Sequence, residues 1–126
     1  MAAKVVDASA VIALMFAEPA GERIAVQLDG ATLFAPTLLP FEIINACATK
    51  LRRHPDLRIE ILQAFALHDG ITVETLEVDG SEVLALAERF RLTGYDASYL
   101  WLAQRLDAEL VTLDTPLARA AIALRP

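Results

Sequence analysis

The chain has 126 residues, of which 56% are hydrophobic, and a formal net charge of −6. This length suits one domain with its own core, and the composition excludes a disordered chain. The negative charge argues against a protein that coats nucleic acid through a basic surface, but not against an enzyme acting on nucleic acid. We therefore expect a single domain over residues 1–126.

Three features bear on location. The longest apolar run, residues 10–17, is far shorter than the roughly 20 residues that a membrane span needs. Residues 1–4 lead directly into a predicted strand, so we expect no signal peptide. Cys47 is the only cysteine, which excludes an intramolecular disulfide and fits a reducing compartment. We expect a cytoplasmic protein that does not contact a membrane.

Strand-like and helix-like segments alternate along the first half of the chain. In order, the sequence predicts strand 4–7, helix 8–16, helix 20–28, strand 32–35, helix 38–53 and helix 56–68. Pro40 is tolerated because it falls in the first turn of its helix. In the helix 56–68 an apolar set recurs at helical spacing, namely Ile59, Leu62, Phe65 and Ala66.

The second half continues the alternation. It predicts strand 71–74, a helix opened by the capping-box spacing of residues 79–82, helix 96–106, strand 109–113 and helix 117–124. Strands alternating with helices imply a parallel sheet covered on both faces. We therefore expect an α/β protein with a central, mostly parallel sheet of four or five strands.

Four acidic residues lie where the sequence is otherwise apolar. Asp7 and Asp114 close predicted strands, whereas Glu42 and Asp96 fall in the first turns of predicted helices. Active sites in open parallel sheets form beyond the carboxyl ends of the strands, so all four acids can reach one edge of the sheet. Taken singly, each also has an ordinary structural explanation, as a helix cap or as a partner of a helix dipole.

Together, four carboxylates would repel one another, and a hard divalent cation removes that conflict. A site of this kind suits hydrolysis of a phosphodiester by metal-activated water, with no nucleophilic side chain. Asn45 shares a helix face with Glu42 and is a candidate to orient it or to touch a phosphate. The hydroxyls of Ser9 and Thr112 are candidates to hold water, although local backbone hydrogen bonding explains them equally well.

The segments around the four acids resemble the acidic motifs of PIN domains, in order and at similar spacing over the whole chain. In length and in the residues of these motifs, the chain most resembles the VapC toxins of bacterial and archaeal VapBC toxin–antitoxin pairs. The matching segments are Val5-Val6-Asp7-Ala8-Ser9, Phe41-Glu42-Ile43-Ile44-Asn45-Ala46, Tyr95-Asp96-Ala97-Ser98-Tyr99 and Val111-Thr112-Leu113-Asp114.

This resemblance implies a three-layer α/β/α fold and an endoribonuclease that depends on Mg²⁺ or Mn²⁺. It implies that Asp7, Glu42, Asp96 and Asp114 are the catalytic and metal-binding acids, with Asp7 and Asp96 first as ligands and Asp114 last. It also implies an RNA substrate, a homodimer, and a small VapB-like antitoxin whose C-terminal part lies over the active-site groove.

Several surface features have two interpretations. Basic residues are either solvated helix ends or contacts to the RNA backbone; they are Lys50, Arg52, Arg53 and Arg58, and separately Arg89 and Arg91. Beside Asp96, we assign Tyr95 and Trp101 to packing, with base stacking as the alternative for Tyr95. Cys47 is expected to be a small buried residue. The apolar stretches 10–16 and 20–28 are candidates to help cover an antitoxin helix.

Two other functions are considered. An aspartyl-phosphate phosphatase or a phosphoacceptor receiver domain needs a second acid near the nucleophile and a lysine late in the chain. Here Ser9 stands two residues after Asp7, and the lysines are Lys4 and Lys50. The other possibility is a non-catalytic PIN-like module that acts with its antitoxin as a co-repressor, and the presence of all four acids argues against it.

Overall fold

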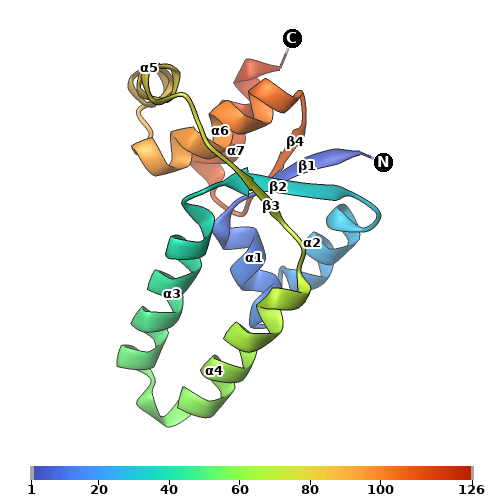
Figure 1. The fold of residues 1–126 in the computed structure, drawn as a ribbon, viewed down its shortest axis with the longest axis vertical. Coiled ribbons are helices and arrows are strands. Elements are labelled where there is room, and N and C mark those ends of the chain that lie inside the picture. The colour runs from blue at the N-terminus through green and yellow to red at the C-terminus, as the bar shows by residue number, and fades with distance from the viewer. Residues whose placement is uncertain (1, 126) are drawn as a thin grey trace.

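Four parallel strands form the central sheet of the computed structural model, which describes residues 2–125 (Figure 1). They are β1 (Ala3–Val6), β2 (Thr32–Pro36), β3 (Glu74–Leu76) and β4 (Glu109–Val111), in the order β3-β2-β1-β4. All three pairings between neighbouring strands are parallel, which confirms the predicted sheet. Residues 1 and 126 lie outside the described residues. They are the two ends of the predicted domain, and residue 1 also belongs to the segment 1–4 for which we expect no signal peptide.

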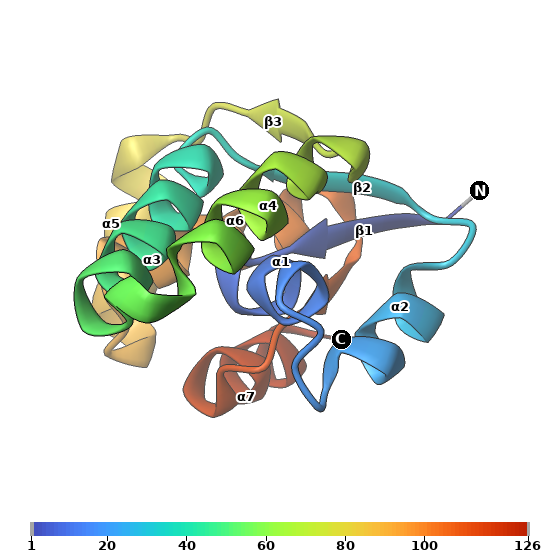
Figure 2. The same cartoon turned by 90° about the horizontal axis from the view of Figure 1, so that it is seen from below.

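Helices cover both faces of this sheet. They are α1 (Ala8–Met15), α2 (Gly21–Leu28), α3 (Leu39–Arg53), α4 (Arg58–Leu67), α5 (Gly80–Phe90), α6 (Gly94–Leu106) and α7 (Thr115–Leu124). Helix α6 lies on one face in contact with β1, β2 and β4, and α5 and α7 pack against it. Helices α1 to α4 lie on the other face (Figures 1 and 2). The arrangement is the predicted three-layer α/β/α fold.

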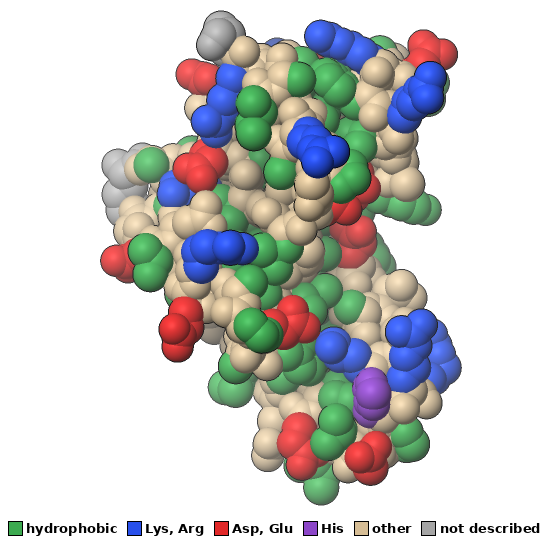
Figure 3. Space-filling view, turned by 180° about the vertical axis from the view of Figure 1, so that it is seen from behind, with side chains coloured by type: hydrophobic (Ala, Val, Ile, Leu, Met, Phe, Trp, Pro, Cys, Tyr) green, Lys and Arg blue, Asp and Glu red, His purple; other side chains and the backbone are tan. Residues whose placement is uncertain are grey.

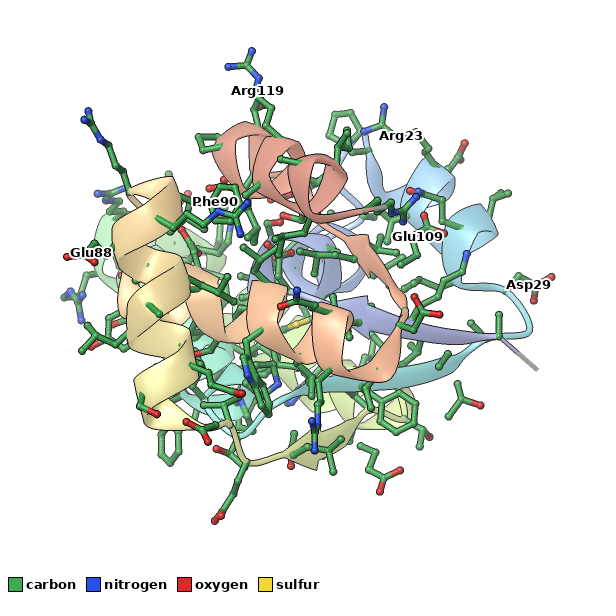
Figure 4. All side chains as sticks on the ribbon, turned by 90° about the horizontal axis from the view of Figure 1, so that it is seen from above. Arg23, Asp29, Glu88, Phe90, Glu109 and Arg119 are labelled. Atoms are coloured by element: carbon green, nitrogen blue, oxygen red, sulfur yellow. The ribbon has the colours of Figure 1, made fainter. Side chains whose placement is uncertain are left out.

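The core lies between α6 and the sheet and between the sheet and α1. Val5, Val6, Leu100 and Val111 are each at most 1% exposed. β1 is buried on both faces, as expected for the central strand of a parallel sheet. At the rim, the charged side chains of Glu88 on α5 and Arg119 on α7 point outward, as seen from above in Figure 4.

Helices α3 and α4 form a hairpin that projects away from the sheet (Figure 1). A 3-10 turn at Pro55–Leu57 joins them. The predicted apolar face of α4 was only partly correct. Ile61 and Ala64 are the buried residues of α4, whereas Ile59 is 68% and Leu62 is 42% exposed. Helix α4 carries apolar residues on several of its sides, so the sequence pattern alone did not identify the face that packs against the rest of the protein.

The third strand differs from the prediction. It occupies residues 74–76 instead of 71–74, because it pairs with the last three residues of β2, Phe34 with Glu74 through Pro36 with Leu76. Ile71 and Val73 pack against the core from an irregular segment that follows a 3-10 turn at His68–Gly70. β4 likewise ends at Val111 and not at residue 113, since the backbone N–H groups beyond it donate to side-chain hydroxyls.

The direction of strand order changes between β1 and β4. β2 and β3 continue the sheet on one side of β1, while β4 lies on the other. In parallel α/β sheets such a switch point opens a crevice at the carboxyl ends of the two strands. Asp7 follows β1 directly, and Asp114 follows β4 by three residues, so both lie at the switch point. Within residues 2–125 no helix combines the length and apolar character needed to cross a bilayer.

Candidate active site

Asp7 lies at the junction of β1 and α1 and is only 5% exposed. Its Oδ1 accepts hydrogen bonds from the backbone N–H of Ala10 at 3.1 Å and from Ser9 Oγ at 2.6 Å. Its Oδ2 accepts one from the hydroxyl of Thr112. Burial raises the pKa of Asp7, and these hydrogen bonds to the carboxylate offset part of that effect. Asp7 is therefore the N-cap of α1 and a buried carboxylate at the end of β1.

Ser9 and Thr112 connect the ends of β1 and β4. Ser9 Oγ accepts from the backbone N–H of Leu113 at 2.9 Å, and Thr112 Oγ1 accepts from that of Asp114 at 2.9 Å. Each hydroxyl has a single proton, and both donate it to Asp7. With both protons used in this way, each hydroxyl could bind a water molecule only as an acceptor, and the contact that each makes here is with the Asp7 carboxylate.

Asp114 is the N-cap of α7, where its Oδ1 accepts from the backbone N–H of Leu117 at 2.8 Å. Capping uses only Oδ1, so Oδ2 of Asp114 stays available for another contact. Its negative charge contributes to raising the pKa of both Asp7 and Asp96. Asp114 thus lies near both of the residues that the resemblance ranks first.

Glu42 and Asp96 reach the same edge from helices. Glu42 is in the first turn of α3, where its Oε1 accepts from the Tyr99 hydroxyl at 2.6 Å. Asp96 is in the first turn of α6, and its backbone N–H donates to Thr93 Oγ1, the N-cap, at 3.0 Å. Burial raises the pKa of Glu42, and the charges of Asp96 and Asp7 add to this. Burial, then Asp114 and Asp7, likewise raise the pKa of Asp96.

The charges of Asp7, Asp96 and Asp114 thus act on neighbouring acids of the set, and that all four form one catalytic site stays a prediction. The ion pairs in residues 2–125 involve other carboxylates, namely those of Glu109, Glu18 and Asp69. Within the same residues, no group of three His, Cys, Asp or Glu side chains has the spacing to hold a metal ion. In chemical type, the four side chains suit a hard divalent cation, since each offers carboxylate oxygens.

The remaining predicted residues have mixed outcomes. Asn45 is exposed one turn beyond Glu42, so its predicted role is neither supported nor contradicted. Cys47 is buried, as predicted. Tyr95 is 66% exposed, so its assignment to packing was wrong. Trp101 is half-buried, and its Nε1 donates to Glu82 Oε2 at 3.2 Å.

The contact between Tyr99 and Glu42 was not predicted from the sequence. Tyr99 follows Asp96 by three residues on α6 and is 1% exposed. Residues three apart share a helix face, so this spacing was the available signal that Tyr99 lies near the acids. Its partner, Glu42, is 57 residues away in the sequence. Only the tertiary structure, which brings Tyr99 of α6 to the first turn of α3, identifies that partner.

Comparison with known proteins decides the family. The family described as PIN domain matches residues 4–123. The chain belongs to the PIN-domain family. This PIN-domain chain is 31% identical over 125 residues to Ribonuclease VapC12 of Mycobacterium tuberculosis, in both strain CDC 1551 / Oshkosh and strain H37Rv. The alignment covers 92% of the chain and 90% of the relative.

A solved structure agrees with this assignment. The crystal structure of PAE2754 from Pyrobaculum aerophilum superposes with a TM-score of 0.67 at 26% identity, over 94% of this chain and 79% of that one. The resemblance to VapC-type PIN-domain proteins is therefore confirmed, and with it the fold.

Proposed function

We propose that the chain, as a single domain over residues 1–126, is a metal-dependent endoribonuclease and the toxin of a type II toxin–antitoxin pair. The observation that carries the proposal is that the charges of Asp7, Asp96 and Asp114 raise the pKa values of neighbouring acids in the set, with no ion-paired cation beside these acids in residues 2–125. The relative named Ribonuclease VapC12 supports RNA as the substrate.

Asp7 and Asp96 are the proposed principal ligands of a Mg²⁺ or Mn²⁺ ion, followed by Glu42 and then Asp114. A bound divalent cation supplies Lewis acidity, which lowers the pKa of water and neutralises charge on the phosphate. The protein's contribution is to orient the carboxylates. Ser9 and Thr112 hold Asp7, while the N-terminal turns of α3 and α6 present Glu42 and Asp96 at the same edge.

The direct test uses purified protein that has been freed of any antitoxin. We expect cleavage of RNA with Mg²⁺ or Mn²⁺ and none with excess EDTA. Cleavage that persists in EDTA would contradict the metal dependence. Intact RNA under all metal conditions, together with tight DNA binding by the chain and its antitoxin, would instead favour the co-repressor function.

Substrate contacts outside the acids are proposed on α3 and beside Asp96. Figure 3 shows lysine and arginine side chains beside a histidine on the projecting hairpin, and the last turn of α3 carries Lys50, Arg52 and Arg53. Lys50 lies 3.9 Å from Glu18, whereas Arg53 has no carboxylate within 4.0 Å in residues 2–125. Contacts to phosphates weaken with salt, so Arg53→Ala should flatten the salt dependence of RNA binding, while Arg89→Ala on α5 should not. If RNA binding by the wild type, Arg53→Ala and Arg89→Ala depends equally on salt, Arg53 does not contact the RNA backbone.

Tyr95 is the second proposed contact. Because its ring is 66% exposed next to Asp96, it is available to stack on an unpaired base. Tyr95→Phe should then retain RNA affinity and Tyr95→Ala should lose it. Equal affinity of the two variants in a filter-binding titration would remove this contact.

A homodimer and an antitoxin are the proposed protein partners. Large apolar side chains are exposed on α2 and on the hairpin, where Val26 is 77%, Phe41 is 72% and Ile59 is 68% exposed. Exposed apolar surface of this kind marks interaction sites. Residues 10–16 and 20–28 are the two stretches expected to cover an antitoxin helix. The first belongs to α1, which packs against α2, α3 and α4, so the second, in α2, is the one with exposed apolar surface at Val26. A monomer in sedimentation, or full RNase activity in the presence of the antitoxin, would contradict the respective proposal.

A further inference from the structure

Tyr99 joins the two helices that carry the helix acids. It lies on α6, one turn beyond Asp96, and its side chain is only 1% exposed. Its hydroxyl donates to Glu42 Oε1 on α3 at 2.6 Å. The buried hydroxyl has no access to bulk water, so this carboxylate satisfies it.

The Tyr99 hydroxyl is a neutral donor. A phenol has an ordinary pKa of about 10, so it carries its proton at neutral pH. That proton has one acceptor, Glu42 Oε1, at 2.6 Å. A neutral donor holds a carboxylate without adding a fifth negative charge to the site.

Glu42 depends on this one contact. Asp7 accepts hydrogen bonds from three different residues, Ser9, Ala10 and Thr112. In residues 2–125, the Glu42 carboxylate accepts only the Tyr99 hydrogen bond, and its Oε2 has no protein donor. A glutamate side chain has several rotatable bonds, so losing its single anchor releases it to many rotamers. With the anchor in place, Oε1 is held and Oε2 is left available.

We propose that Tyr99 is a positioning residue that holds the Glu42 carboxylate in the orientation in which Oε2 can bind the catalytic cation. This inference rests on the proposed function and deepens it. Partners that orient metal ligands are as much a part of a metal site as the ligands themselves, and their loss typically weakens metal affinity about 10–100-fold.

The test is a double-mutant cycle on Mn²⁺ affinity, measured by calorimetry without RNA. Tyr99→Phe removes one oxygen and keeps the buried ring, and we expect it to weaken Mn²⁺ binding by about 10–100-fold. In a Glu42→Gln background, the same change should have no further effect, because Tyr99 acts through Glu42. Trp101→Phe is the control, since it removes another hydrogen bond from an aromatic side chain of α6 to a glutamate, here Glu82, and it should leave the affinity unchanged.

Unchanged affinity in Tyr99→Phe overturns the proposal, and so do effects of Tyr99→Phe and Glu42→Gln that simply add. A urea-unfolding cycle on the metal-free variants separates positioning from packing. Coupling in stability without coupling in Mn²⁺ affinity means that the contact only stabilises the fold, which also overturns the proposal.

The proposed function fails separately. Wild-type protein that binds Mn²⁺ but cleaves no RNA contradicts the nuclease, while the affinity cycle still supports or overturns the role of Tyr99. Wild-type protein that cleaves RNA, with unchanged Mn²⁺ affinity in Tyr99→Phe, overturns the positioning role alone.

Discussion

The two strand-end acids are held differently from the two helix acids. Asp7 and Asp114 belong to a network of backbone and hydroxyl donors that crosses from β1 to β4. Glu42 has one side-chain partner, Tyr99, and Asp96 is held through Thr93, whose Oγ1 accepts from the Asp96 backbone N–H. The strand-end acids are therefore held by more hydrogen bonds than the helix acids. Removing donors on the strand side tests whether that network matters for the proposed site.

The largest effect is expected for Asp7→Asn. It removes the most buried and most hydrogen-bonded of the four carboxylates, so cleavage should fall by more than about 100-fold, beyond the loss typical of residues that only orient ligands. Asp96→Asn on the helix side should have a comparable effect in the same cleavage assay. Near-wild-type activity in either variant would remove that residue from the ligand set. Circular dichroism should show an intact fold, because a buried negative charge is lost and not gained.

Removal of the Thr112 hydroxyl should have an intermediate effect. Thr112→Val keeps the shape of the side chain but deprives Asp7 Oδ2 of its donor. Activity and Mn²⁺ affinity should each fall about 10–100-fold, with the fold retained. Thr72→Val, in the exposed loop before β3, is the matched control and should behave as the wild type. If Thr112→Val also behaves as the wild type, the network on the strand side does not contribute to the site.

The raised pKa values of Asp7, Glu42 and Asp96 predict how metal-free stability depends on pH. Between the unfolded and folded pKa values, the folded state binds more protons than the unfolded state, so stability decreases as pH rises. The contribution of these acids is fully present below about pH 4, where the unfolded carboxyls are also protonated, and is lost through the raised folded pKa values. Urea midpoints from pH 4 to 8 should show this slope, and Asp7→Asn should reduce it. Mn²⁺ should reverse the trend, because it binds ionised carboxylates. A slope unchanged by Asp7→Asn would contradict the assignment.

The smallest effect is expected for Asp114→Asn. Asparagine caps helices about as well as aspartate, so α7 should remain capped and the free energy of unfolding nearly unchanged. Activity should fall by less than about 10-fold, that is by less than about 1.4 kcal/mol. A loss as large as that of Asp7→Asn, in the same assay, would show that both strand-end acids are essential and that their shared network is the centre of the site.

The sequence by itself determined much of this protein. Hydrophobic periodicity placed the alternating strands and helices, and the capping residues Asp7, Asp79 and Asp114 opened the helices that follow them. The four acids could be selected from sequence because a charged residue in an apolar stretch is rare without a partner. Their spacing also resembled PIN-domain motifs, which the family match over residues 4–123 confirmed.

Tertiary structure decided the rest. The position of β3 follows from its pairing with the end of β2, a contact between segments about forty residues apart, and local periodicity at Ile71 and Val73 pointed to the wrong segment. The packed face of α4 was ambiguous because the helix is apolar on several sides. The hydrogen bond from Tyr99 to Glu42 joins helices distant in sequence. Local patterns report which residues avoid water, but a particular partner across the fold is chosen only when the layers pack.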